Sequence, residues 1–330
     1  MPAPLNGMDK RRYFFRKVLN ALLIIVLVAS FNFVLFRVLP GNPARLLLPR
    51  GRWDAAAIAK QARIFQLDRP LWEQFGYYWF DMAQGKLGNS FQYERPAISV
   101  VWQRVPATLL LVGTGTVIAI AIGLVTGTYA GWRRDGWFDT SSTTIGMVFY
   151  STPTLWVGLV LIMVFSAKLG WFPSGRMSDP GVTYASWFDH LRTILNHLVL
   201  PAMTFALVYI GQYHTIMRTS LSGVSNEDFV LTARAKGLSD SRVLWGHVVP
   251  NALLPTATVI MMNLGFIMSG AILTETVFNW PGIGLLSYQS MMNLDYPVLQ
   301  AVFLLASVAV ILANLAADIL YYYLDPRVRA

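Results

Sequence analysis

The chain has 330 residues, of which 55% are hydrophobic and only 13% are charged. Soluble globular proteins carry about a quarter charged residues, so this composition excludes an ordinary soluble domain and indicates that lipid surrounds most of the chain. The net charge of +9 does not indicate nucleic-acid binding, because the basic residues gather beside apolar segments and not among stacking aromatic residues. Without cysteine, a disulfide framework or a cysteine-containing metal site is excluded.

Six apolar segments are long enough to cross about 30 Å of hydrocarbon as helices. The sequence therefore predicts an all-α polytopic membrane protein. The first segment follows a basic N-terminus, residues 1–17, and lacks a small-residue cleavage site, so we expect it to be retained and not removed as a signal peptide. The predicted transmembrane segments are 18–38, 107–130, 140–167, 197–217, 253–277 and 298–323.

The basic residues of the short loops predict the orientation. Arg133 and Arg134 follow the second segment, the polar segment 218–252 carries four more basic residues, and Arg327 and Arg329 lie in the tail. With six spans, all of these lie on the same side as the N-terminus, which the positive-inside rule makes the cytoplasm. Both termini are then cytoplasmic.

The long loop, residues 39–106, is then external, since long loops cross largely regardless of their charge. Within it, the stretch from Leu67 to Ser90 predicts an aromatic amphipathic helix that begins at Pro70 and ends near Gly85. Its aromatic residues favour packing against the spans of this chain over a place at the membrane surface.

A polar segment from Glu227 to Pro255 predicts two short helices between apolar segments. Ser225 or Asn226 suits the N-cap of the first helix, and Gly237 suits a left-handed terminator. Ser239 or Asp240 suits the N-cap of the second.

We expect Pro250 to stop that second helix. Local chemistry leaves two interpretations of the helix pair, a docking surface for a partner or an ordinary solvated loop.

Small residues recur at every fourth position of the second span. They lie on one helix face, which favours close helix packing. The lining of a transport pathway is the alternative. The residues are Gly115, Ala119, Gly123, Gly127 and Gly131.

Three ionisable residues, His214, Glu275 and Asp318, lie late in spans or near their ends. The cost of burial falls near the membrane surface, so we do not expect a proton relay. A hydrogen bond between helices suffices for Asp318. The apolar segment from Phe278 to Pro297 is interrupted by proline and glycine, and predicts either a stretch that re-enters the protein or a plain surface hairpin.

Catalytic motifs of zinc proteases, serine hydrolases and phosphate-binding loops are missing, so the chain is not expected to hydrolyse ATP or to act as an enzyme. An ion-coupled secondary transporter needs carboxylates in the middle of spans and an internal repeat, and neither is evident.

Ten motifs in order make the chain resemble the permease subunits of binding-protein-dependent ABC importers, most closely the dipeptide, oligopeptide and nickel branch. The resemblance covers nearly the whole chain. The motifs are LPGNP at 39–43, LDRP at 67–70, GKLGNS at 85–90, STPTLWVG at 151–158, FPSGR at 172–176, LPA at 200–202, TARAKGL at 232–238, AILTETVFNWPGIG at 271–284, DYPVLQ at 295–300 and LYYYLDPRVR at 320–329.

The resemblance implies six spans of the type I ABC importer kind and a cytoplasmic coupling helix, the EAA motif, that inserts into a groove of an ATPase subunit. The Glu of that motif is replaced by Leu231, and Pro250 stands where the branch often has Arg, so a contact made by that Arg does not transfer. The residues expected to couple to the ATPase are Ala233, Arg234, Ala235, Lys236 and Gly237.

The resemblance also implies the partners: a second homologous permease in a heterodimer, two ATPase subunits that carry ATP and Mg²⁺, and an external solute-binding protein. No cofactor or metal is expected on this chain. A di- or oligopeptide is the expected solute, imported by alternating access. Oligosaccharide, nickel and glutathione are the alternatives, because specificity resides largely in the binding protein.

Overall fold

The computed structural model describes residues 7–38, 69–266 and 271–324. These residues form helices, and their only extended pairing is an isolated bridge between Asn89 and Pro96. This confirms the all-α prediction for the described part of the chain. The LPGNP motif and the basic residues Arg327 and Arg329 lie outside the described residues.

Among the described residues, four helices are long and apolar enough to cross a membrane, and the spanning stretch of each contains or overlaps a predicted span. They belong to α1 (Gly7–Val38), α5 with α6 (Ala97–Trp102 and Val105–Trp132), α9 (Trp187–Val224) and α15 (Tyr296–Leu324). The predicted fifth segment, 253–277, falls on α12 (Val249–Phe266) and a short helix, α13 (Ile272–Val277). The count of six spans therefore stays a prediction.

The predicted third span, 140–167, is not one straight helix. It divides into α7 (Trp137–Ser151) and a second piece formed by α8 (Thr154–Leu161) and the π-helical η1 (Ile162–Lys168), and the two pieces meet at a bend of 102°. Pro153 lies at the break. Its ring disfavours helical backbone in the residue before it, and it has no N–H to donate.

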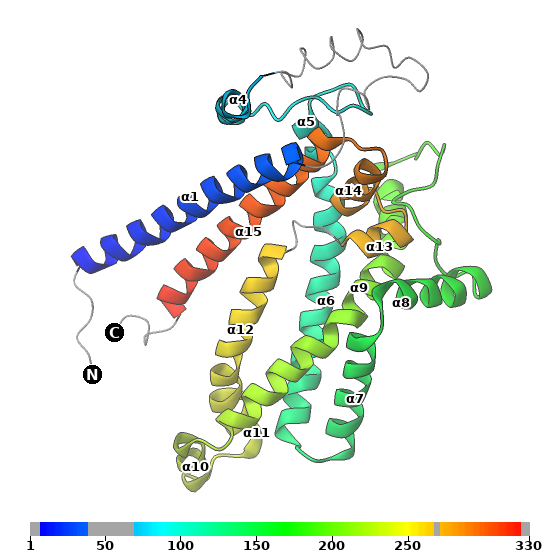
Figure 1. Ribbon diagram of the computed structural model, residues 1–330. Coiled ribbons are helices and arrows are strands. Elements are labelled where there is room, and N and C mark those ends of the chain that lie inside the picture. The colour runs from blue at the N-terminus through cyan, green and yellow to red at the C-terminus, as the bar shows by residue number, and fades with distance from the viewer. Residues whose placement is uncertain (1–6, 39–68, 267–270, 325–330) are drawn as a thin grey trace.

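The helices form a bundle with two distinct ends (Figure 1). At one end lies α10 (Asp228–Ala235), and we call this the loop end. At the opposite end lie α4 (Leu71–Ala83), α5 and α14 (Ile283–Met292), and we call this the cap end. The pair α1 and α15 lies side by side, and Lys17 Nζ of α1 donates to Asp318 Oδ2 of α15 at 2.7 Å. Asp318 thus joins two helices, as expected.

The small residues of α6 lie in its contact with α9, the most extensive helix pair of the structure. A Cβ placed on Gly123 would lie 2.6 Å from Tyr213 Cβ, and one on Gly127 would lie 2.5 Å from the carbonyl oxygen of His214. Gly115 likewise faces Phe205, and Ala119 is fully buried. Close packing is therefore what this face does, and the pathway-lining alternative finds no space for a solute there.

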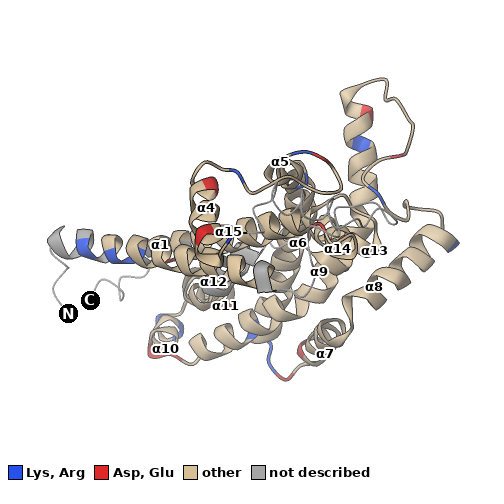
Figure 2. Ribbon diagram, turned by 45° about the horizontal axis from the view of Figure 1, so that its top comes forward, with Lys and Arg blue, Asp and Glu red and all other residues tan. Residues whose placement is uncertain are grey.

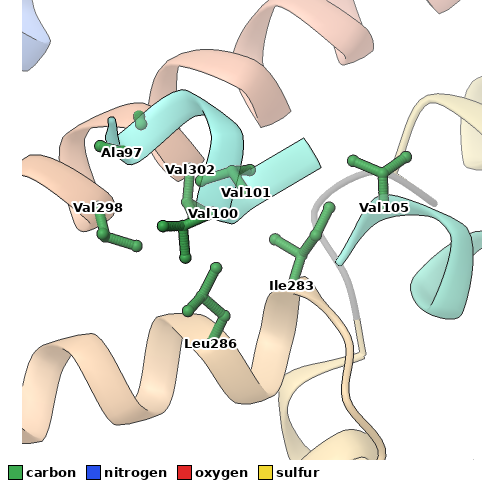
Figure 3. Packing of buried hydrophobic residues seen from close by; sticks show 9 residues of the cluster. Ala97, Val100, Val101, Val105, Ile283, Leu286, Val298 and Val302 are labelled. Atoms are coloured by element: carbon green, nitrogen blue, oxygen red, sulfur yellow. The ribbon is translucent and has the colours of Figure 1, made fainter. Parts of the chain in front are cut away.

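At the cap end, apolar side chains from four helices form one cluster. Figure 3 shows Val100 of α5 and Leu286 of α14 pointing toward one another, with Ile283 and Val302 nearby. The segment from Phe278 to Pro297 thus packs into the protein, and the surface-hairpin alternative is wrong. Fully buried members of this segment include Phe278, Trp280 and Ile283.

Glu275 holds this segment in place. Its side chain is fully buried, Oε1 accepts a hydrogen bond from Thr108 Oγ1 at 2.8 Å, and Oε2 accepts one from the Leu285 N–H at 2.9 Å. Thr108 Oγ1 in turn accepts from the Ile283 N–H at 2.7 Å. The carboxylate is thus tied by hydrogen bonds to both α6 and α14, a structural role that the sequence did not reveal.

The predicted amphipathic helix is present as α4. Pro70 is its N-cap, and Gly85 just beyond its end has a left-handed φ of +73°. The Phe33 ring of α1 lies 5.3 Å from the Phe75 ring and 5.4 Å from the Tyr78 ring of α4, measured between centroids. This confirms that the helix packs against a span of the same chain.

We predict that Gly127→Leu destabilises the protein, because its side chain would overlap the backbone of α9. Overpacking of this kind costs about 1–3 kcal/mol or more. Thermal unfolding of the detergent-purified protein measures the effect. Gly113→Leu on the same helix is the control, because a Cβ there meets nothing within 4 Å. Equal stability of the two variants would contradict the packing described.

A second prediction concerns Thr108→Val, which keeps the shape of the side chain and removes its hydroxyl. The Ile283 N–H and Glu275 Oε1 both lose a partner in a buried site, so the free energy of unfolding should fall by about 1–3 kcal/mol. Denaturant unfolding of the purified protein checks this. The control is Thr114→Val, since the structure shows no side-chain hydrogen bond of Thr114 among the described residues. A loss no larger than that of the control would refute the role of Thr108.

Candidate functional site

The polar segment 218–252 folds as two short helices at the loop end (Figure 1). The first is α10, and the second is α11 (Asp240–Val243), which continues through the π-helical η2 (Leu244–Val248) into α12. The two-helix prediction is confirmed, and the two helices connect the end of α9 to the start of α12.

Gly237 ends α10 as predicted. Its φ is +78°, and its N–H donates to the Arg234 carbonyl at 2.9 Å while the Lys236 N–H donates to the Thr232 carbonyl at 3.1 Å. Glycine reaches this left-handed region without a steric penalty, so the chain turns there and α10 stays short.

The predicted N-cap of α10 is wrong. Glu227 occupies that position and makes no side-chain cap hydrogen bond. Ser225 Oγ and Asn226 Nδ2 donate instead to the carbonyls of Leu221 and Ser222, at 2.7 and 3.2 Å. These side chains thus bond to carbonyls in the last turns of α9, and no side-chain cap forms at the N-terminus of α10.

Pro250 does not stop the second helix. Ser239 is the N-cap, as expected, but helical backbone runs on through Pro250 to Phe266. The wider turn of η2 lies directly before the proline, and a π-type turn of this kind lets a helix pass a residue that has no N–H to donate.

The inner face of α10 packs against its own chain. Val230 is fully buried and Ala233 is 5% exposed. Their cluster joins the ends of three helices and contains Met217, Leu221, Val243, Leu244, Val248, Val249 and Ala252. The Ala233 methyl group therefore lets α10 lie close to this chain, and it points away from any partner.

The outer face of α10 is open. Phe229 is 41% exposed and Leu231 is 58% exposed, although both are large and apolar. The other four residues predicted to couple to an ATPase, Arg234 to Gly237, are also exposed. An exposed apolar surface bordered by charged residues is typical of a protein interface.

Arg234 is held in place on this face. Its guanidinium carbon lies 5.4 Å from the centroid of the Trp132 ring at the end of α6, and its Nε lies 4.0 Å from Asp240 Oδ1 of α11. A cation above an indole ring is attracted by about 0.5–1 kcal/mol at an exposed site. This residue therefore links the loop to α6 as well as to α11.

A polar network fastens the helices next to the loop. Arg218 of α9 forms a two-pronged ion pair with Asp139 of α7, in which Nη2 lies 2.7 Å from Oδ2. Farther along α9, His214 lies 3.1 Å from the hydroxyls of both Thr143 on α7 and Thr126 on α6. The network links α6, α7 and α9 at this end.

Sequence reasoning missed the pairing of Asp139 with Arg218. The two residues lie 79 positions apart, and each alone resembles an ordinary charge at a helix end. Their shared signal is weak: one acid and one base placed near the same predicted membrane surface.

A further hydrogen bond joins α9 to α12, from Ser220 Oγ to the Ala252 carbonyl at 2.7 Å. The loop thus contacts α6 through Arg234 and Trp132, and it lies between α9 and α12, which Ser220 and Ala252 join. Figure 2 shows that charged residues are sparse along the helices and gather in loops and near helix ends. The arrangement suits the transfer of a push on α10 to several spans at once.

Comparison with known proteins identifies the family. Residues 106–330 match the family described as "Binding-protein-dependent transport system inner membrane component". Residues 10–112 match the corresponding N-terminal family, "Binding-prot-dependent transport system membrane comp, N-term". The two matches together cover nearly the whole chain.

Individual relatives are similar over almost their full length. The dipeptide transport system permease protein DppB of Alkalihalophilus pseudofirmus is 32% identical over 330 residues, which covers 96% of this chain and 99% of the relative. The di/tripeptide transport system permease protein DppB of Pseudomonas aeruginosa is 36% identical, covering 92% and 94%. The glutathione transport system permease protein GsiC of Escherichia coli is 36% identical, covering 96% and 98%.

The candidate loop lies within the matched residues 106–330. The chain belongs to the family of inner membrane components of binding-protein-dependent transport systems, as a permease subunit of the dipeptide/oligopeptide type of ABC importer.

Proposed function

We propose that this permease forms half of the translocation pathway for di- or oligopeptides, and that α10 couples it to an ATPase subunit by alternating access. The observation that carries the proposal is the double character of α10. Its inner face is built into the ends of three spans, and its outer face presents Phe229, Leu231, Arg234 and Lys236. Such a helix transmits force only if a partner covers the outer face.

The loop end is then cytoplasmic, with both termini on that side, and the cap end is external. ATP and Mg²⁺ belong to two ATPase subunits, and this chain has no catalytic role. Shifting the ratio of two conformations of a gate from about 1:99 to about 99:1 requires a partner that binds one conformation more tightly by roughly 5.5 kcal/mol. That free energy must pass through α10, which explains why its inner face is so firmly attached.

A second, homologous permease in a heterodimer completes the pathway, and an external solute-binding protein delivers the solute. The names of two relatives, which specify dipeptides and di- or tripeptides, support a peptide as solute. Glutathione, itself a tripeptide, is the second candidate, because a relative of equal identity is named for it.

Gly237→Pro tests the coupling role. Proline requires φ near −65° and has no N–H, whereas Gly237 has a φ of +78° and donates to Arg234. The end of α10 must therefore change shape while the spans stay intact. We expect normal membrane insertion and at least a tenfold loss of ATP-driven peptide uptake in proteoliposomes that contain the assembled complex.

Gly85→Pro is the matched control, because Gly85 also has a positive φ of +73° just beyond a helix end, but at the cap end. It should leave ATPase activity stimulated by the binding protein, whereas Gly237→Pro should not. Normal uptake by the Gly237 variant would show that the coupling assignment is wrong.

Leu231→Asp tests the docking surface itself. A charge on this exposed position leaves the fold of α10 unchanged but opposes burial against an apolar groove. We expect the yield of ATPase subunits that co-purify with the permease to fall about tenfold. Leu294→Asp, also on an exposed leucine but at the cap end, should retain them. Equal co-purification by both variants would exclude Leu231 from the contact.

A further inference from the structure

A pocket of about 630 Å³ with a mixed polar and apolar lining lies at the cap end, where α9 begins. The loop that precedes α9 forms one wall, and the first turns of α9 form the other. This volume lies within the range of about 300–1,000 Å³ that is typical of small-ligand sites. Its polar lining residues are Asp179, Asp189, Arg192, Thr193, Asn196 and His197.

His197 is the unusual member of this lining. It is 4% exposed, and its Nδ1 lies 2.8 Å from the Gly175 carbonyl oxygen. Because a carbonyl only accepts, Nδ1 carries the hydrogen. The other ring nitrogen, Nε2, is buried without a hydrogen-bond partner among the described residues.

The carboxylate of Asp179 lies next to the unpartnered nitrogen of His197. Its Oδ1 lies 3.3 Å from His197 Nε2, without a hydrogen bond between them. Only His197 Nε2 is buried, since the Asp179 side chain is 55% exposed. Buried polar atoms are almost always paired, so His197 Nε2 calls for a partner beyond the described residues.

Contacts with Phe278 fix the position of the loop that precedes α9. The Arg176 N–H donates to the Phe278 carbonyl at 2.6 Å, which docks the loop on α13. Gly175 leaves no space for a side chain against the same carbonyl. The wall that carries Asp179 is therefore fixed to the segment that Glu275 holds in place, and the pocket is built before any ligand arrives.

An ammonium group fits beside His197 Nε2 and the Asp179 carboxylate. It has three donors and no acceptor, and its charge complements Asp179 and Asp189. A metal ion fits less well, because no group of three or more His, Cys, Asp or Glu side chains able to hold one occurs among residues that the structure describes.

The same pocket contains a group for the opposite charge. Arg192 has no ion-pair partner within the described part of the chain, and a guanidinium binds a carboxylate through two parallel hydrogen bonds. Thr193 and Asn196 of the lining supply hydroxyl and amide groups suited to a peptide bond. A ligand with an ammonium at one end and a carboxylate at the other matches this lining.

We propose that this pocket is a transit site for a zwitterionic short peptide, with its α-ammonium between His197 Nε2 and Asp179 and its carboxylate at Arg192. The inference rests on the proposed function, since it takes a peptide as the solute. It adds that this permease itself contacts the charged ends of the peptide after release from the binding protein.

The test uses the assembled complex in proteoliposomes, with radiolabelled alanyl-alanine and saturating loaded binding protein. Asp179→Asn and Arg192→Gln each remove one charge from an exposed side chain. Each should lower uptake about tenfold, since each removes a charge-assisted hydrogen bond, while docking of the binding protein stays unchanged. Asp179→Glu and Arg192→Lys keep the charge and should recover part of the rate.

Glu94→Gln and Lys168→Gln remove exposed charges outside the pocket and should transport normally. Co-purification with the ATPase subunits verifies that every variant assembles. Normal uptake by both pocket variants would overturn the proposal. A loss of binding-protein docking in proportion to uptake would overturn it too, because the pocket would then be a protein contact. If the unmodified complex takes up no alanyl-alanine, the proposed peptide function itself fails.

Discussion

The contact between α6 and α9 is the constraint on which the rest of the structure depends. Small residues at every fourth position of α6 bring its backbone against that of α9. In lipid there is little hydrophobic gain from joining two apolar helices, so close packing and polar contacts must hold them together. The contact runs from Gly115 near the cap end to Gly131 near the loop end, so the two helices behave as one rigid element.

Helix α9 is long enough to reach from one end of the bundle to the other. Its 38 residues correspond to about 57 Å at about 1.5 Å per residue, well beyond the hydrocarbon thickness of about 30 Å. One end carries His197 and the pocket, and the other carries Arg218, Ser220 and the attachment of the loop. One continuous helix therefore joins the attachment of the loop to the opposite side of the bundle.

At the cap end, hydrogen bonds of buried polar groups hold the segments together, as close packing does along α6 and α9. Glu275 gathers α6, α13 and α14 through hydrogen bonds, and Asp295 accepts hydrogen bonds from Ser90 Oγ and the Phe91 N–H. Each carboxylate satisfies donors of an irregular segment that would otherwise be unpaired at a membrane boundary. The cap end is thus held by buried hydrogen bonds, whereas the outer face of α10 is exposed.

The sequence by itself determined the helical class, the positions of most spans, and the terminators at Gly85 and Gly237, because periodicity, apolar length and glycine geometry are local properties. Local rules failed at two places. Ser225 and Asn226 bond to carbonyls of α9 and do not cap α10. Helical backbone continues from η2 through Pro250. Only the tertiary structure decided that Gly123 and Gly127 serve packing, that Glu275 pairs with Thr108, and that His197 faces Asp179. These outcomes depend on contacts between residues far apart in the chain, and no local pattern specifies which distant partner arrives.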